Sequence, residues 1–115
     1  PSLCELCGLT LPAQLEGTSF DPLMKKPDRA WKTAAFSQYP RGKVMGYSMR
    51  TDRWRYTEWR NPDGSVKATE LYDHRTDPQE NQCLAKRSEH AALIQEFAAR
   101  LKAGWKAARP ADLGK

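Results

Sequence analysis

Hydrophobic and polar side chains alternate with a two-residue period through the middle of the chain, a pattern typical of half-buried β-strands. We predict four strands, at Ala34–Tyr39, Val44–Arg50, Arg53–Arg60 and Ala68–Tyr72. Only short connections separate neighbouring strands, so each consecutive pair is expected to form an antiparallel hairpin. The pattern therefore predicts one four-stranded antiparallel sheet.

Turn residues support this arrangement. Thr51-Asp52 separates the second strand from the third, and Asn61-Pro-Asp-Gly64 closes the third onto the fourth. Gly64 suits the left-handed residue of a bulged hairpin. Beyond the sheet, Asp77-Pro-Gln-Glu80 has the order of an N-cap, a proline at the first helical position and a Glu at N3. That order predicts a short helical turn with a capping box.

A four-residue apolar repeat after Ser88 is the clearest helical signal in the chain. The repeating positions are Leu93, Phe97, Leu101 and Trp105, flanked by Ile94 and Ala98. We predict a helix over 88–107 that lays this stripe across one face of the sheet. Sheet and helix together make the predicted fold class α+β.

The residues before the sheet have a different character. Pro1–Gly8 predicts a short helix, and Leu9–Lys32, interrupted by Pro and Gly, predicts an extended strap. We therefore expect a helix and strap over 1–32, a subdomain over 33–109 and a flexible tail over 110–115. The strap is too apolar for a free linker, so we expect self-association through residues 9–32 when no partner covers it.

The chain carries 19 Lys and Arg against 14 Asp and Glu, a net charge of +5. A basic surface favours polyanionic partners such as nucleic acid or a sulfated glycan. Strand alternation should divide the basic residues of the central hairpin between two faces, which weakens the case for one continuous patch. These residues are Arg41, Lys43, Arg50, Arg53, Arg55 and Arg60. No apolar run approaches the ~18 residues that a membrane span needs, so no membrane partner is expected.

Several stretches of the chain resemble the C-terminal part of sulfatases, in particular the iduronate sulfatase branch. They are Phe36-Ser-Gln-Tyr-Pro-Arg41, the hairpin Met45–Trp59, and Glu70-Leu-Tyr-Asp-His-Arg-Thr-Asp-Pro-Gln-Glu-Asn81. Pro1–Leu9 and Leu15–Leu23 resemble the segment where sulfatases leave the large catalytic domain. The resemblance implies a C-terminal subdomain of the alkaline-phosphatase-like sulfatase fold, with the catalytic half elsewhere.

The resemblance also implies formylglycine, made from the Cys or Ser of a Cys/Ser-x-Pro-x-Arg motif, and Ca²⁺ held by carboxylates. Within this chain, Cys83-Leu-Ala-Lys-Arg87 is a near match, with Ala85 in place of Pro. The family pattern has an ordinary Asn at the position of Cys83, so we interpret it as a loop cysteine. We expect formylglycine and Ca²⁺ in the absent catalytic domain, and no cofactor, metal or catalytic residue in this chain.

The pair Cys4-x-x-Cys7 fits neither a zinc site nor a redox motif. A zinc site needs two more ligands, and the candidates His74, His90 and Cys83 are distant in sequence. A redox pair needs a βαβ context, which is missing. We interpret both cysteines as replacements of small apolar residues and both histidines as solvated.

Strand alternation places Tyr56 and Trp59 on opposite faces of the sheet, so at least one face is expected to be core beneath the helix. On the same grounds the aromatic residues of this hairpin are interpreted mainly as core rather than as a sugar-stacking platform. Arg50 is expected to pair with a sheet carboxylate, either Glu58 or Asp73.

Gln38, Tyr39 and Arg41 are the strongest candidates for substrate-binding residues. They are predicted to lie where the first strand ends in a proline-containing loop, and loops on a rigid scaffold often carry binding groups. The resemblance implies that this edge faces the substrate cleft, where Arg41 can contact a carboxylate or sulfate of a uronate sugar. A second interpretation stays open, in which Tyr39 and Arg41 only attach the subdomain to the catalytic domain.

The resemblance implies a C-terminal fragment of a sulfuric ester hydrolase that supports the catalytic domain and shapes its substrate pocket. A sulfated uronate-type sugar is the expected substrate class, and the fragment alone is expected to be inactive. The alternative is a stand-alone basic module that binds a polyanion; nucleic acid is the weaker partner because no RNA-binding signature occurs. The resemblance implies an exported parent, periplasmic or extracellular, although the chain itself gives no location.

Overall fold

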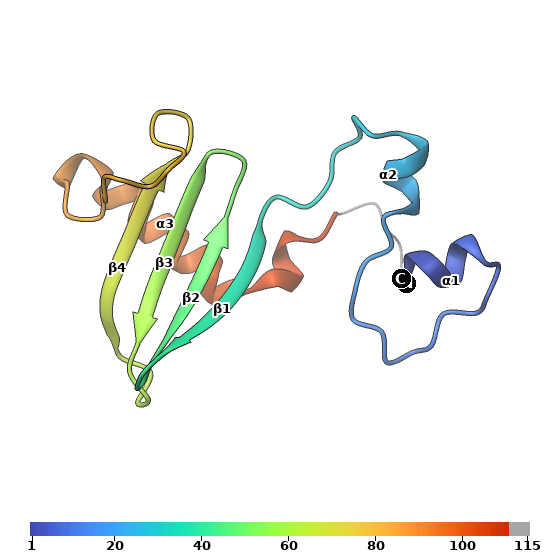
Figure 1. Ribbon diagram of the computed structural model, residues 1–115, viewed down its shortest axis with the longest axis horizontal. Helices are drawn as coiled ribbons and strands as arrows, with labels where there is room; N and C mark the ends of the chain where they lie inside the picture. Colours follow the sequence, from blue (N-terminus) through green and yellow to red (C-terminus); the bar gives the residue numbers. More distant parts are fainter. Residues whose placement is uncertain (111–115) are drawn as a thin grey trace. The chain divides into compact units, whose positions relative to one another are not determined.

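The computed structural model describes residues 1–110, which divide into two compact units. Of these, Pro1–Trp31 together with Arg109 and Pro110 form the first unit, and Lys32–Ala108 form the second. The second unit contains the sheet and the C-terminal helices (Figure 1). None of the helices within 1–110 is long and apolar enough to cross a membrane.

The second unit is an antiparallel sheet of four strands in the order β1-β2-β3-β4. The strands are β1 Ala35–Arg41, β2 Val44–Arg50, β3 Trp54–Arg60 and β4 Val66–Asp73. Each strand pairs antiparallel with the next strand in sequence, and a short turn connects the two. The predicted set of hairpins is therefore confirmed. β1 runs two residues beyond its predicted end, and β4 begins two residues before its predicted start.

The turn between β3 and β4 has the predicted bulged geometry. The Gly64 backbone N–H donates to the Asn61 carbonyl at 2.9 Å, and Gly64 has a φ of +85°. A register shift follows between Trp59 and Arg60. Glycine reaches this left-handed conformation without the steric cost that a side chain adds.

One face of the sheet is covered by the C-terminal helix, which lies behind the strands in Figure 1. The predicted single helix over 88–107 is divided into η1 Ser88–His90, α3 Ala91–Ala103 and η2 Trp105–Ala108. Gly104, with a φ of +78°, ends α3, and its N–H donates to the Arg100 carbonyl at 3.1 Å. The apolar repeat continues past this glycine in sequence, which is why it predicted too long a helix.

The core lies between α3 and the sheet. Its centre is one cross-strand row, Met49, Tyr56 and Leu71, each 1% exposed or less. Phe97 of α3 covers this row, with its ring centroid 6.1 Å from that of Tyr56. Ala108 closes one end of the core, where its carbonyl accepts from the Thr33 N–H at 3.3 Å.

The first unit contains two short helices, α1 Ser2–Leu6 and α2 Asp21–Lys25. The predicted helix at the N-terminus is confirmed, with Gly8 beyond its end at a φ of +66°. The prediction of an element-free strap is wrong, because α2 forms within it. Pro22 in the first turn and an Asp21–Lys25 ion pair at 2.6 Å stabilise α2.

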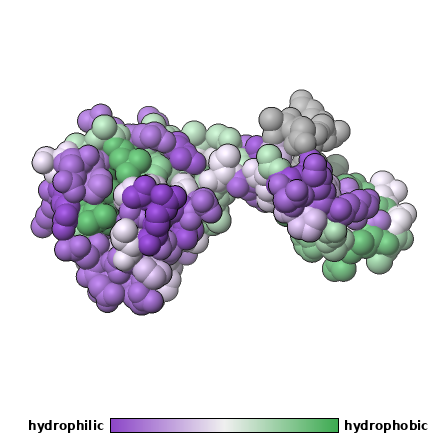
Figure 2. Space-filling view, turned by 90° about the horizontal axis from the view of Figure 1, so that it is seen from above, coloured by the Kyte–Doolittle hydropathy of each residue, from purple (hydrophilic) through white to green (hydrophobic). Residues whose placement is uncertain are grey.

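Apolar side chains remain exposed in the first unit, and Figure 2 shows hydrophobic residues gathered on its surface. The largest exposed ones are Leu3, Leu6, Leu9, Leu11, Leu15, Phe20 and Met24. Of the predicted tail over 110–115, residues 111–115 lie outside the described part of the chain, so its flexibility stays a prediction.

Candidate functional site

The face of the sheet opposite α3 has no covering element within residues 32–108, and we call it the open face. Strand register assigns residues to it, because directly paired residues point to the same side. Its members include Ser37, Tyr39, Arg41, Gly46, Ser48, Arg50, Arg55, Thr57, Trp59, Glu70 and Tyr72.

A hollow of about 290 Å³ lies in the open face. Small residues form its floor, chiefly Gly46, Ser48 and Thr57, and the Ser48 and Thr57 hydroxyls are hydrogen-bonded at 2.9 Å. Tyr39 and Trp59 form part of its wall. Thr57 is only 4% exposed although no element covers this face, because its neighbours close around it.

Trp59 is the central aromatic side chain of the hollow. Its ring lies against Gly46, where a Cβ atom would stand 2.8 Å from the ring. Its indole N–H donates to Glu70 Oε1 at 3.0 Å, and the Arg41 guanidinium lies 5.9 Å from the ring centroid. Packing, a hydrogen bond and a cation–π contact thus fix the orientation of one ring.

Replacing Gly46 by Ala is expected to lower the free energy of unfolding by about 1–3 kcal/mol, because the new methyl group displaces the Trp59 ring and its bond to Glu70. Urea unfolding and tryptophan emission measure the two effects. Ala68→Ser, an exposed position opposite Trp59 on β4, is the matched control and should change stability by less than ~0.5 kcal/mol. Unchanged stability and unchanged emission in Gly46→Ala would contradict this packing.

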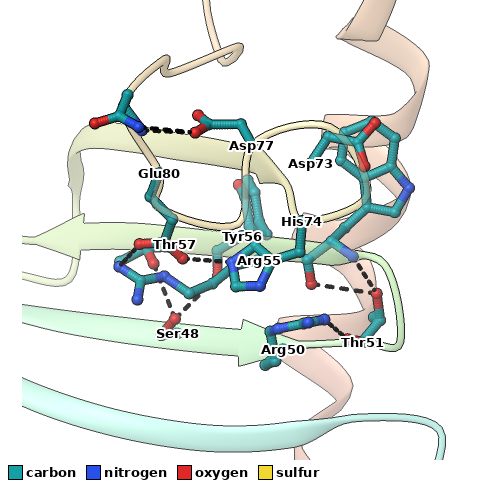
Figure 3. Close-up of polar contacts among 12 residues, drawn as sticks. Ser48, Arg50, Thr51, Arg55, Tyr56, Thr57, Asp73, His74, Asp77 and Glu80 are labelled. Atoms are coloured by element: carbon teal, nitrogen blue, oxygen red, sulfur yellow. Dashed lines mark hydrogen bonds and ion pairs between the residues drawn. The ribbon is translucent and has the colours of Figure 1, made fainter.

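A polar network borders the hollow at the β4 end of the open face (Figure 3). Glu80 accepts from Arg55 at 2.9 Å through one oxygen, and its other oxygen lies 2.6 Å from His74 Nε2. The Arg55 guanidinium also lies 5.7 Å from the centroid of the Tyr72 ring. The three charged or polar side chains therefore tie the loop after β4 to the sheet.

This network corrects two predictions. Residues 77–80 form a single turn, in which the Glu80 N–H donates to the Asp77 carbonyl at 3.1 Å, but no helix and no capping box: Glu80 has a φ of +58° and turns its carboxylate to Arg55 and His74. Asp77 still caps the turn, accepting from the backbone N–H groups of Asn81 and Gln82, and these bonds lower the pKa of its carboxyl group. His74 is paired rather than solvated, and His90 packs edge-on against Trp54 at 5.6 Å.

The prediction for Arg50 is also wrong. Its guanidinium donates to the Thr51 carbonyl, while Arg60 pairs with Glu58 at 2.6 Å. Buried Asp73 pairs instead with Arg53, which donates from Nε at 2.9 Å. The hydrogen bond from Arg53 is the main reason that the pKa of Asp73 is lowered.

Glu58 also accepts a hydrogen bond from the Tyr56 hydroxyl at 2.9 Å. Burial, followed by this bond, raises the pKa of Tyr56. The Tyr56–Glu58–Arg60 group therefore satisfies polar atoms beside the core on the α3 side.

The three predicted substrate-binding residues do not meet at one place. β1 continues through Pro40 to Arg41, so they lie within a strand and not in a loop. Tyr39, which is 67% exposed, and Arg41 belong to the open face, whereas Gln38 projects from the α3 side. A ligand on the open face can therefore contact Tyr39 and Arg41 but not Gln38. Trp59 was not among the predicted site residues, because its place beside Arg41 depends on the strand register.

The cysteines are all free thiols, and Cys83 is exposed. Across residues 1–110, no group of three or more His, Cys, Asp or Glu side chains is placed to hold a metal ion. The sheet carboxylates Glu58, Glu70 and Asp73 and the loop carboxylate Glu80 each accept from a side chain of the same unit. This part of the chain therefore does not fit the Ca²⁺ site that the sulfatase resemblance implies.

Comparison with known proteins places this fold in a family. Residues 1–107 match the family described as N-sulphoglucosamine sulphohydrolase, C-terminal. The Delta 4,5-hexuronate-2-O-sulfatase of Bacteroides thetaiotaomicron is 31% identical over 114 residues, covering 89% of this chain and 23% of that protein.

Two solved structures have the same fold. One is a protein in complex with its substrate D-glucosamine-2-N,6-O-disulfate, with a TM-score of 0.69, 21% identity and coverage of 90% of this chain and 24% of that chain. The other is the phosphonate monoester hydrolase of Agrobacterium radiobacter, with a TM-score of 0.72, 22% identity and coverage of 93% and 23%.

This chain spans less than a quarter of the length of each of these three relatives. Its α+β architecture, a four-stranded antiparallel sheet with a C-terminal helix, is shared with both solved structures. The sheet, the helix and the match over residues 1–107 agree, and the chain belongs to the family of sulfatase C-terminal domains exemplified by N-sulphoglucosamine sulphohydrolase.

Proposed function

We propose that this chain is the C-terminal domain of a sulfuric ester hydrolase that acts on a sulfated uronate-type sugar. In that protein it supports the catalytic domain and shapes one wall of the substrate pocket. The observation that carries the proposal is the 31% identity to a hexuronate sulfatase over 89% of this chain. Because this chain corresponds to 23% of that relative, most of the machinery is expected in the remainder of the parent.

The nucleophile and the cation of such an enzyme are expected in the catalytic domain, as formylglycine and Ca²⁺. Purified alone, the chain should release no product from an aryl sulfate, with or without Ca²⁺, since a positioned nucleophile and metal supply most of the rate enhancement. Turnover that disappears in Cys83→Ala would assign the chemistry to the Cys83–Arg87 segment instead. A Cys/Ser-x-Pro-x-Arg motif encoded upstream of Pro1 would support the proposal at the sequence level.

Tyr39 and Arg41 are the residues proposed to reach the substrate pocket. Both project from the open face at the exposed end of the β1–β2 hairpin, and Arg41 is oriented against Trp59. A guanidinium held there can donate two parallel hydrogen bonds to the carboxylate or sulfate of a uronate.

Arg41→Ala in the full-length parent should raise KM for a sulfated uronate disaccharide by about tenfold and leave kcat nearly unchanged, because a lost charge-assisted bond weakens binding. Lys43→Ala, an exposed change in the adjoining turn, is the control and should leave both constants unchanged. Equal KM values for Arg41→Ala and the parent would contradict a contact between Arg41 and the substrate.

The alternative function, a free-standing polyanion-binding module, has weaker support. Three of the six basic side chains within 41–60 pair with carboxylates: Arg53, Arg55 and Arg60. Of the four that lie on strands, Arg41, Arg50 and Arg55 are on the open face and Arg60 is on the α3 side, whereas Lys43 and Arg53 lie in the turns. Weak retention on heparin with a shallow salt dependence, lost at low salt, is therefore expected, whereas a steep salt dependence would favour the alternative.

A further inference from the structure

We propose that a hollow on the α3 side of the sheet, beside Trp105, is a second binding site that holds one uncharged pyranose unit of a glycan. The hollow has a volume of about 340 Å³ and is lined by residues of β1, β2 and the end of α3. Tyr39 and Arg41, the residues proposed to reach the substrate pocket, project from the opposite side of the sheet. The inference rests on the proposed function only in taking the ligand to be part of the same glycan.

Trp105 is an aromatic residue that the fold leaves outside the core. The four-residue repeat that begins at Leu93 predicts it as part of the stripe packed on the sheet. Gly104 ends α3 before this position, and Trp105 belongs neither to the core cluster nor to the hydrophobic side chains packed against it. It is 37% exposed and lines the hollow. An exposed indole is a platform on which the apolar C–H face of a sugar ring can pack.

The segment that carries Trp105 is held at both ends. The Gly104 N–H donates to the Arg100 carbonyl at 3.1 Å, and the Thr33 N–H donates to the Ala108 carbonyl at 3.3 Å. Ala108 is itself buried. The ring is therefore presented by a fixed backbone, which lowers the entropy that a ligand loses in ordering its site.

Tyr47 and Arg60 line the hollow from the sheet. The Arg60 guanidinium lies 5.2 Å from the centroid of the Tyr47 ring, and its Nε and Nη2 donate to Glu58 at 2.8 and 2.6 Å. Glu58 is only 4% exposed, so its negative charge stays beside Arg60 and offsets it. This wall carries no unbalanced charge, so it does not select an anion such as sulfate.

Three polar groups of the hollow are available to a ligand. Within residues 1–110, the Gln38 amide, the Tyr47 hydroxyl and Nη1 of Arg60 have no hydrogen-bond partner. Gln38 and Tyr47 are directly paired in the β1–β2 register, so their side chains lie side by side. An amide and a phenol each donate and accept, as a sugar hydroxyl does, and a guanidinium donates.

These features together identify the class of ligand. A pyranose ring combines an apolar C–H face, suited to an aromatic ring, with a rim of hydroxyls suited to the amide, the phenol and the guanidinium. Small-molecule sites range from about 300 to 1,000 Å³, and they combine apolar walls with a few placed polar groups. At about 340 Å³, the hollow suits a single sugar ring.

The edge position of β1 connects the hollow with the proposed substrate contacts. Gln38 and Tyr39 are neighbours in sequence and project to opposite sides of this exposed strand. A glycan whose sulfated unit contacts Tyr39 and Arg41 can therefore cross the edge of β1 and place a later unit beside Gln38. The second contact is then intramolecular, so it favours long glycans over disaccharides.

Titration of this chain with N,N′-diacetylchitobiose, an uncharged disaccharide of N-acetylglucosamine, tests the site by ¹H–¹⁵N NMR. The Trp105 indole signal should shift in a saturable way at millimolar concentrations, while the signal of Trp31, in the first unit, is the reference and should not shift. Sorbitol, which carries hydroxyls but no ring, and inorganic sulfate should leave the Trp105 signal in place. A Trp105 signal that does not move with the disaccharide, or that moves equally with sorbitol or sulfate, would overturn the proposal.

Variants at exposed positions assign the contacts, with the backbone signals of β1 as the readout. Trp105→Ala should raise Kd by about tenfold or more, because the packing surface is lost, and Trp105→Phe should keep most of the affinity. Gln38→Ala should raise Kd by about threefold through a lost hydrogen bond. Gln95→Ala, the same change on the exposed side of α3, is the matched control and should bind as wild type. Wild-type affinity in both Trp105→Ala and Gln38→Ala, with unchanged melting temperatures, would contradict this assignment.

The full-length parent separates this proposal from the proposed function. The ratio of KM for a sulfated disaccharide to KM for a sulfated octasaccharide should fall by about tenfold in Trp105→Ala and stay unchanged in Gln95→Ala. An active parent with equal ratios in Trp105→Ala and wild type would overturn the role of the hollow in glycan binding and leave the proposed function intact. A parent that releases no sulfate would overturn the proposed function, while the titration of this chain would still decide whether the hollow binds a sugar.

Discussion

Replacing Phe97 by Ala is expected to lower the free energy of unfolding by about 3–5 kcal/mol, the range for removing a buried aromatic side chain from a core. Phe97 is 2% exposed and is the buried residue of α3. It covers the row formed by Met49, Tyr56 and Leu71, so its loss leaves a cavity against the sheet. Urea unfolding of the chain, followed by circular dichroism, measures the change.

Glu96→Ala is the matched control for Phe97→Ala. Glu96 is the preceding residue of α3, its side chain is 60% exposed, and its contact with Arg100 is at 3.5 Å. Its removal should change stability by less than ~0.5 kcal/mol, as for most exposed ion pairs. If Phe97→Ala costs no more than this control, the α3 stripe is not the packing face of the helix.

The second large effect is expected in the oligomeric state of the chain in solution. The full chain should self-associate, because the first unit exposes leucines and Phe20 in the part that the resemblance assigns to the catalytic domain interface. Burial of that surface in a second copy gains roughly 25 cal/mol per Å². A version that begins at Lys32 keeps the sheet unit and should be monomeric.

Light scattering on both versions over a range of concentrations checks this result. Two substitutions extend the test. Replacing Leu9 and Leu11 by Ser in the full chain should reduce association if these side chains form the contact. A full chain that is monomeric at all concentrations, and no less soluble than the shorter version, would contradict this expectation. It would mean that the strap is not a surface that needs a partner to cover it.

The sheet was predictable because its strands alternate cleanly and lie next to one another in sequence. The end of β1 was predicted too early because Pro40 follows Tyr39, and proline commonly marks a loop. β1 is an edge strand, where a missing N–H costs no ladder bond on the solvent side, and the strand continues. The C-terminal helix was instead predicted too long, because the four-residue apolar repeat continues past Gly104, the residue at which α3 ends.

The polar network was beyond the reach of sequence patterns. Glu80 stands at the spacing of a capping box, but long-range contacts with Arg55 and His74 determine its conformation. In the same way, the proximity of Trp59 and Arg41 depends on a register that only the paired strands define. Local spacing predicts elements, whereas the site on the open face arises from residues on different strands.

Sulfate release by the full-length parent tests the central claim most directly. The phosphonate monoester hydrolase of Agrobacterium radiobacter shares this fold, so the decisive measurement compares two esters with one enzyme. We expect the enzyme to release inorganic sulfate from a 2-O-sulfated uronate disaccharide and to hydrolyse little phosphonate monoester under the same conditions. Hydrolysis of the phosphonate monoester without any release of sulfate would contradict it.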